Sequence, residues 1–248
     1  MSKIPIGLQL YSIRDDCARD LPGTLKAVAK MGYDGVECAG YHGYSAKELR
    51  KMLDDLGLRC CGTHLGIEAL LGEELPHTVE FNLTLGNPFL IVPGLPDEYT
   101  VSLAAWRKTA AVFSEAAARV APQGLRVGYH NHYTEFQKME GEVPFDVFFN
   151  TAHPSVVMQL DIGNAMEGGA DALAYLRRYA ARAGTVHFKE HAHGNPNALL
   201  GEGDVNWKEV FAICQKAGKT DWYVVEQESY AFPPMECVER CLVNLKKI

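Results

Sequence analysis

The chain has 248 residues, enough for one large barrel domain or two small domains, and 47% of them are hydrophobic, as expected for a protein with a full core. Its formal net charge of -7 argues against nucleic acid as a partner, because binding to a phosphate backbone depends on a basic surface. The lack of a membrane-length apolar run or signal peptide, together with seven cysteines and no Cys-x-x-Cys pair, predicts a cytoplasmic protein with reduced thiols.

Short segments with the composition of β-strands alternate along the chain with segments of helical periodicity. The predicted strands are residues 6–11, 33–38, 58–64, 89–94, 126–131, 156–161, 184–190 and 222–228. The predicted helices are residues 21–32, 45–57, 72–86, 101–121, 145–152, 170–184, 206–218 and 235–248. Ser45 and Glu48 predict a capping box, and Gly32, Gly57 and Gly218 stand where a helix ends with a left-handed residue.

Eight strands, each followed by a helix and with no linker between units, favour a parallel (β/α)8 TIM barrel. A doubly wound open sheet is the rival fold. It usually has fewer strands, and its nucleotide-binding forms carry a GxGxxG turn that this chain lacks. We expect residues 1–248 to form one such barrel domain.

The alternation of side chains between the two faces of a strand predicts which polar residues point into the barrel. One set of side chains on each barrel strand faces the helices and must be apolar, while the other set faces the interior. Polar residues of the interior set cluster at the C-terminal ends of the strands, where barrel enzymes place their active sites. The set that we expect to form the site comprises Gln9, Glu37, His64, His130, His132, Asp161, His187, Lys189 and Glu226, and we expect Tyr11, Gln159, Thr185 and Glu228 to face inward as well.

Four members of this set stand on consecutive strands and predict a metal site: His130, Asp161, His187 and Glu226. Two nitrogens and two carboxylates suit a borderline divalent ion such as Mn²⁺, Zn²⁺, Co²⁺ or Fe²⁺ better than Mg²⁺. Two carboxylates buried without a cation would also be costly. The alternative is that each residue is simply a hydrogen-bonded member of the interior.

The other five members are expected to surround a substrate: Gln9, Glu37, His64, His132 and Lys189. Lys189 can neutralise negative charge that develops on a substrate oxygen, or form a salt bridge to Glu226 or Glu228. His64 and His132 can act as acid and base groups or as hydrogen-bond donors.

The order of several motifs along nearly the whole chain resembles the xylose-isomerase-like TIM-barrel family, in its YHNH-type branch. The motifs are LQLYSIRDD, GVECAGYHG, GTHLG, YHNHYTEF, LDIGNA, VHFKE, LGEGDVNW and VVEQE. The family groups sugar phosphate isomerases/epimerases and ketose 3-epimerases with hydroxypyruvate isomerases, inosose dehydratases and endonuclease IV. The resemblance implies a small carbohydrate as substrate and a homo-oligomer as the assembly.

The resemblance also implies one divalent metal ion, often Mn²⁺, at the ends of strands five to eight. Asp161, His187 and Glu226 match the family's aspartate, histidine and final glutamate. At the end of strand five the ketose epimerases carry a glutamate that is both ligand and base, and this chain has His130 there.

We therefore expect a metal-dependent sugar isomerase/epimerase that transfers a proton α to a carbonyl. Glu226 would act as ligand and base, and His64, His132 or Lys189 would handle the second proton. One alternative is a metal-dependent lyase or dehydratase of a keto-sugar or keto-inositol. Others are a sugar-binding protein without catalysis and a zinc nuclease, which would need more ligands and a basic face.

Overall fold

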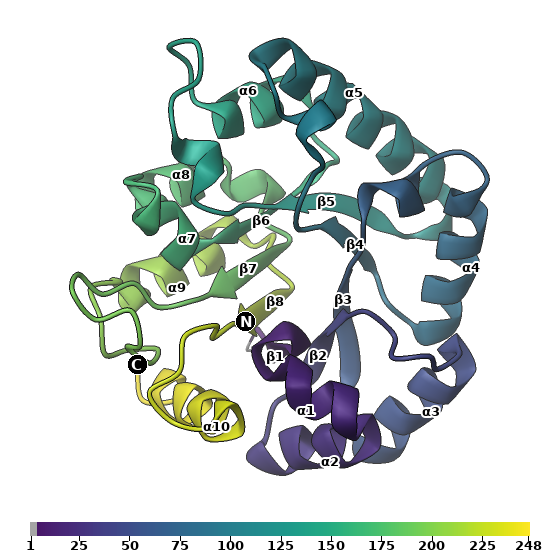
Figure 1. Cartoon of the computed structure of the whole chain (residues 1–248), viewed down its shortest axis with the longest axis vertical. Helices are drawn as coiled ribbons and strands as arrows, with labels where there is room; N and C mark the ends of the chain where they lie inside the picture. The colour runs from purple at the N-terminus through teal and green to yellow at the C-terminus, as the bar shows by residue number, and fades with distance from the viewer. Residues whose placement is uncertain (1–3) are drawn as a thin grey trace.

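Eight parallel strands close into a barrel in the computed structural model, which describes residues 4–248 (Figure 1). Each strand pairs with the next, and β8 pairs with β1, so the sheet has no free edge. The predicted (β/α)8 TIM barrel is therefore confirmed. The strands are β1 Ile6–Gln9, β2 Gly35–Ala39, β3 Arg59–His64, β4 Phe89–Val92, β5 Arg126–His130, β6 Val157–Asp161, β7 Thr185–Phe188 and β8 Trp222–Val225.

A ring of helices surrounds these strands (Figure 1). It consists of α2 Leu21–Met31, α3 Ala46–Leu56, α4 Glu74–Leu85, α5 Leu103–Val120, α6 Pro144–Thr151, α8 Ala172–Arg178, α9 Trp207–Ala217 and α10 Pro234–Leu245. The capping box of Ser45 and Glu48 is present at the start of α3. Gly32, Gly57 and Gly218 end their helices with φ of 93°, 69° and 62°, as predicted.

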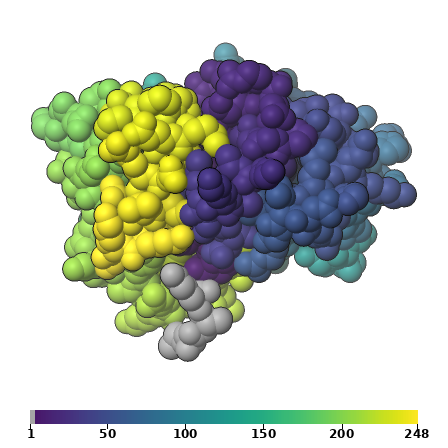
Figure 2. All heavy atoms as spheres, turned by 90° about the horizontal axis from the view of Figure 1, so that it is seen from below, coloured from purple at the N-terminus to yellow at the C-terminus, as the bar shows by residue number. Residues whose placement is uncertain are grey.

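The two ends of the chain meet and close this ring. Figure 2 shows the C-terminal segment, in yellow, against the N-terminal segments, in purple. The Tyr33 hydroxyl, just after α2, donates a hydrogen bond of 2.7 Å to the carbonyl of Val238 in α10. Within residues 4–248, no helix combines the length and apolar character needed to cross a membrane.

The short helical segments that directly follow β1 and β6 were not predicted. Strand β1 ends at Gln9 rather than Tyr11, because a 3-10 helix, η1 (Leu10–Ile13), and α1 (Arg14–Arg19) follow at once. Tyr11 is therefore 44% exposed and does not belong to the barrel interior. Likewise α7 (Ile162–Glu167) begins directly after Asp161. In both cases the last strand residue caps the new helix with its side chain, a local interaction that strand periodicity does not reveal.

The barrel interior has an apolar floor and a polar upper layer. The floor consists of Cys61, Phe89, Ile91, Val157, Trp222 and Val224. A register shift between β2 and β3 lets Cys61 and Gly62 both face inward, so Cys61 packs toward Gly7 while Gly62 lies under Glu37. Above this floor, the interior positions at the C-terminal strand ends are polar.

Gly128 on β5 is expected to tolerate no side chain. A Cβ there would lie 2.6 Å from Ile91 Cδ1 and 2.8 Å from Val157 Cβ, inside the floor. We predict that Gly128→Ala lowers the free energy of unfolding by about 1–3 kcal/mol through overpacking, measured by urea denaturation. Gly94→Ala is the matched control, because nothing lies within 4 Å of its Cβ position. Equal stability of the two variants would contradict the packing described here.

Candidate metal centre and active site

Four side chains converge at the C-terminal ends of consecutive strands. His130 ends β5, Asp161 ends β6, His187 lies in β7 and Glu226 follows β8 directly. One ligand atom from each lies within 4.8 Å of the others, and all four residues are buried. The structure thus brings together the four residues that alternation selected as a metal-ligating set.

Asp161 is held so that one carboxylate oxygen remains available. Its Oδ1 accepts a hydrogen bond of 2.7 Å from the Asn164 backbone N–H, at the start of α7. The Asn131 side chain accepts from the Asp161 N–H at 2.9 Å and donates to its carbonyl at 3.2 Å. Asp161 Oδ2 is buried and has no hydrogen-bond partner among residues 4–248. Because an unpaired buried carboxylate oxygen is costly, this atom is a candidate cation ligand.

His187 lies between two carboxylates. Its Nδ1 is 2.7 Å from Glu226 Oε2, and its Nε2 is 2.6 Å from Glu37 Oε2. Burial opposes the charged ring, but Glu37 and Glu226 outweigh burial and raise the pKa of His187 to about 10. In the metal-free protein the ring is therefore an imidazolium that supplies the positive charge these carboxylates need.

The other three members of the set differ in charge. Burial, reinforced by His187, lowers the pKa of His130 well below its usual range, so this imidazole is neutral. Its Nδ1 donates to Gln159 Oε1 at 3.1 Å, which leaves the Nε2 lone pair free. Burial raises the pKa of Asp161 to about 7. Burial also favours a higher pKa at Glu226, but the positive charges of His187 and Lys189 outweigh burial and lower the pKa of Glu226 to about 2.

These donors fit a divalent cation. The set offers a neutral imidazole, an unpaired carboxylate oxygen, a second carboxylate and a histidine whose Nδ1 faces that carboxylate. Such a mixture of nitrogen and oxygen suits a borderline ion. A bound cation would also satisfy Asp161 Oδ2, which has no hydrogen-bond partner among the described residues and lies 3.8 Å from His187 Nδ1.

Lys189 forms an ion pair with Glu228 at the edge of the site. Burial opposes its charge, but Asp161, Glu226 and Glu228 raise its pKa above the usual range. Lys189 is therefore a fixed cation beside the cluster. Of the two salt bridges considered from the sequence, the structure shows the one to Glu228.

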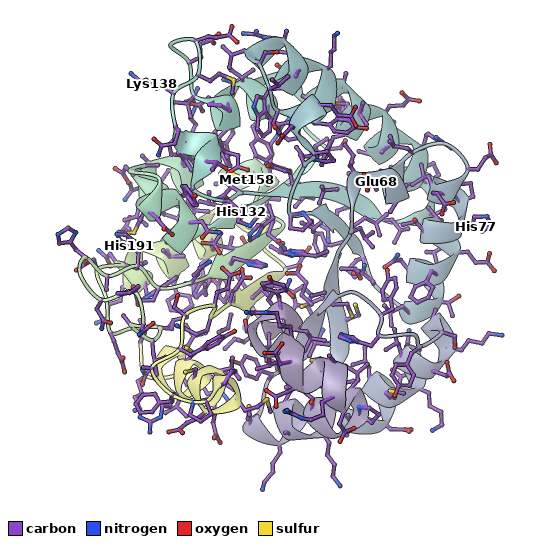
Figure 3. The ribbon with its side chains drawn as sticks, viewed as in Figure 1. Glu68, His77, His132, Lys138, Met158 and His191 are labelled. Atoms are coloured by element: carbon purple, nitrogen blue, oxygen red, sulfur yellow. The ribbon has the colours of Figure 1, made fainter. Side chains whose placement is uncertain are left out.

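A cavity of about 490 Å³ opens above the cluster, a size suited to a small molecule. Its walls include Tyr11, Ala39, His64, Leu65, Gly66, Pro93, Gly94, His130, His132, Glu226 and Glu228. Of the predicted site residues, His64, His130, His132 and Glu226 line this cavity, whereas Asp161, His187 and Lys189 do not. Gln9 and Glu37 are fully buried outside its walls. Figure 3 shows His132 near the centre of the barrel and His77 and His191 at its periphery.

Three residues that organise the site were given no such role from the sequence. Asn131 holds Asp161, and Gln159 bridges His130 and Glu37. Glu135 accepts hydrogen bonds from the His132 N–H at 2.9 Å and from the Tyr129 hydroxyl at 2.5 Å. The available signal was the polar residues Asn131 and Glu135 in the histidine-rich and aromatic segment that runs from the end of β5 into the 3-10 helix η5 (Thr134–Phe136).

The fold and the site together define a TIM-barrel protein with a buried histidine and carboxylate cluster under a small-molecule cavity. Residues 25–240 match the xylose isomerase-like TIM barrel family. The chain belongs to this family, as its motifs indicated.

Known relatives and solved structures agree with this membership. An inosose dehydratase of Erwinia tasmaniensis is 29% identical over 144 residues, or 50% of this chain, and the match spans about half (48%) of that relative. An inosose dehydratase of Geobacillus kaustophilus is 24% identical over 91% of this chain and 92% of that protein. A sugar phosphate isomerase/epimerase from Parabacteroides distasonis has the same fold, with a TM-score of 0.83 and 24% identity over 98% of this chain and 93% of that one.

The charge on His187 predicts a pH dependence of the metal-free protein. Because the folded pKa is about 10 and the ordinary value is 6.5, the stabilisation is complete below pH 6.5. This stabilisation is lost as the pH rises from 6.5 through about 10. Each unit between the ordinary and the folded pKa corresponds to roughly 1.4 kcal/mol of stabilisation. Urea denaturation in the presence of a chelator measures this loss, and imidazole NMR signals assign it to His187. A His187 signal that titrates below pH 7 would contradict the ion pairs described above.

Proposed function

We propose that this protein is a divalent-metal-dependent sugar isomerase/epimerase that transfers a proton at the carbon α to a carbonyl of a small carbohydrate. The observation that carries the proposal is the cluster of His130, Asp161, His187 and Glu226 with its unpaired Asp161 oxygen, at the base of the cavity. These four residues would hold the ion, with Mn²⁺ preferred and Zn²⁺, Co²⁺ or Fe²⁺ as alternatives. When bound, the ion would act as a Lewis acid that polarises the carbonyl and acidifies the neighbouring C–H.

Glu226 is the proposed base. Its carboxylate lines the cavity and is ionised at neutral pH, because His187 and Lys189 keep its pKa low despite burial. It can therefore accept a proton from a substrate carbon held in the cavity. Lys189 does not line the cavity but is ion-paired with Glu228, which does, so its positive charge would favour negative charge that develops on a nearby substrate oxygen.

His64 and His132 are the proposed groups for the second proton transfer. His64 Nε2 donates to Gln159 Oε1 at 2.8 Å, and its Nδ1 has no hydrogen-bond partner within residues 4–248. The His132 ring also lines the cavity without a side-chain hydrogen bond to the described part of the chain. Either ring, when it is protonated as an imidazolium, would deliver a proton to the substrate after Glu226 has taken one, and would then be reprotonated from solvent.

A metal-dependent dehydratase is the second candidate, favoured by the inosose dehydratase relatives, one of which covers 91% of this chain. Proton removal by Glu226 would be the same in that reaction. The difference would be that His64 or His132 protonates a departing β-hydroxyl instead of a carbon or a carbonyl oxygen. The presence of His130 at the end of β5 leaves Glu226 without a carboxylate partner from that strand, which suits elimination or transfer on one face.

Turnover in D₂O distinguishes these reactions. The Mn²⁺-loaded protein is incubated with aldoses, ketoses and keto-inositols, and the products are examined by mass spectrometry. Isomerisation or epimerisation introduces deuterium without loss of water, whereas dehydration removes one water. We predict that Glu226→Gln lowers the rate at least about 100-fold, because general-base catalysis contributes that much or more.

Glu142→Gln is the matched control, because Glu142 is an exposed carboxylate paired with Arg107. It is expected to react at the wild-type rate. Failure of the wild-type protein to retain metal, or a Glu226→Gln variant as fast as wild type, would overturn the proposed function. Tight sugar binding without turnover would instead identify a binding protein.

A further inference from the structure

Glu37 accepts hydrogen bonds from three interior side chains and contacts a fourth, His64. Gln159 Nε2 donates to its Oε1 at 2.7 Å, and Gln9 Nε2 donates to its Oε2 at 2.8 Å. His187 Nε2 and His64 Nε2 contact the same Oε2 at 2.6 Å and 3.1 Å. Glu37 is 0% exposed and is not among the residues that line the cavity.

We propose that Glu37 is a positioning residue that orients His187 for the divalent ion, an inference that rests on the metal site of the proposed function. The Nε2 atom of His187 forms a hydrogen bond with Glu37 Oε2 at 2.6 Å. Its Nδ1 side therefore faces the cluster, 2.7 Å from Glu226 Oε2 and 3.8 Å from Asp161 Oδ2. Histidines that bind metals commonly donate their second ring N–H to a carboxylate, which fixes the ring and strengthens the ligand.

Only a carboxylate meets the hydrogen-bonding demand at this position. Three donors hydrogen-bond to its two oxygens, and His64 Nε2 lies 3.1 Å from one of them. An ionised carboxylate offers acceptors without any donor of its own. A glutamine of nearly the same volume would have one acceptor oxygen and an NH₂ group. That NH₂ would face the donors of Gln9, Gln159 or a histidine, so one or more of these bonds would be lost.

Two further features restrain the Glu37 and His187 pair. A Cβ at Gly62 would lie 2.3 Å from Glu37 Oε1, so the glycine on β3 leaves the space that the carboxylate occupies. The His64 and His187 rings stack at 5.4 Å between centroids with 9° between planes. Both rings contact the same carboxylate oxygen. The Glu37 contact thus fixes both the position and the plane of His187.

The test is Mn²⁺ affinity, measured by calorimetry on the full chain after removal of metal. Loss of the carboxylate behind a metal-bound histidine typically weakens metal binding about 10–100-fold, and we expect Glu37→Gln to fall in that range. Asp146→Asn is the matched control, because Asp146 accepts hydrogen bonds from Tyr175 and Tyr179 on other elements. It is expected to bind Mn²⁺ as wild type does.

Imidazole NMR of the Zn²⁺-loaded protein provides a readout that does not depend on activity. The hydrogen-bonded Nε2–H of His187 is expected in wild type and should shift or exchange rapidly in Glu37→Gln. If Glu37→Gln does not fold, as judged by circular dichroism, Glu37→Asp takes its place, because it keeps the charge and withdraws the carboxylate by one methylene.

The outcomes separate the two proposals. Wild-type affinity and an unchanged His187 signal in the folded variant would overturn the role of Glu37 and leave the metal site standing. Absence of Mn²⁺ binding by the wild-type protein would overturn both. Weakened Mn²⁺ binding with a shifted His187 signal, alongside an unaffected Asp146→Asn, supports the positioning role.

Discussion

Charge neutralisation inside the barrel is the constraint on which the rest of the site depends. Glu37, Asp161 and Glu226 are all buried, and isolated buried carboxylates are costly. In the metal-free protein the His187 imidazolium spans two of them, and Lys189 lies at the edge of the group. Asp161 Oδ2 has no hydrogen-bond partner within the described part of the chain. His187 and Lys189 thus neutralise part of the negative charge of the cluster, and Asp161 Oδ2 marks the position where an added cation would bind.

The closed barrel makes this concentration of charge possible. Closure gives every strand two hydrogen-bonded neighbours, so the strand ends are held at fixed spacing and direct their interior side chains toward one axis. The apolar floor below, which includes Phe89, Ile91 and Trp222, separates the polar layer from the N-terminal end of the barrel. Short helices at the ends of β1 and β6 then start from capping interactions by Gln9 and Asp161, so the same residues terminate strands and organise the site.

The sequence was sufficient to predict the barrel and which side chains face its interior. Alternation with a period of two is a local property, and it placed His130, Asp161, His187 and Glu226 on the inner face without any knowledge of their partners. It does not determine depth along the barrel axis. Glu37 and Gln9, expected near a substrate, lie buried outside the walls of the cavity, because the stagger between strands and the bulge in β3 set their height. Their predicted role in contacting substrate stays a prediction.

Other parts of the site arise from contacts between segments far apart in the chain. Nothing near Asn131 in the sequence shows that its amide would bond the backbone of Asp161, thirty positions away along the chain. Similarly, the pairing of His187 with Glu37 joins β7 to β2 across the barrel. Family membership accounts for the barrel, whereas the choice between the proposed isomerisation and dehydration would depend on the side chains of the cavity.

We propose that the buried cluster binds a cation, and anomalous diffraction from crystals soaked in Mn²⁺ can locate that cation. We predict a single strong peak within coordination distance of His130, Asp161, His187 and Glu226, with Asp161 Oδ2 among the ligands. Absence of a peak at saturating Mn²⁺, or a peak elsewhere with His187 still bridging Glu37 and Glu226, would contradict it.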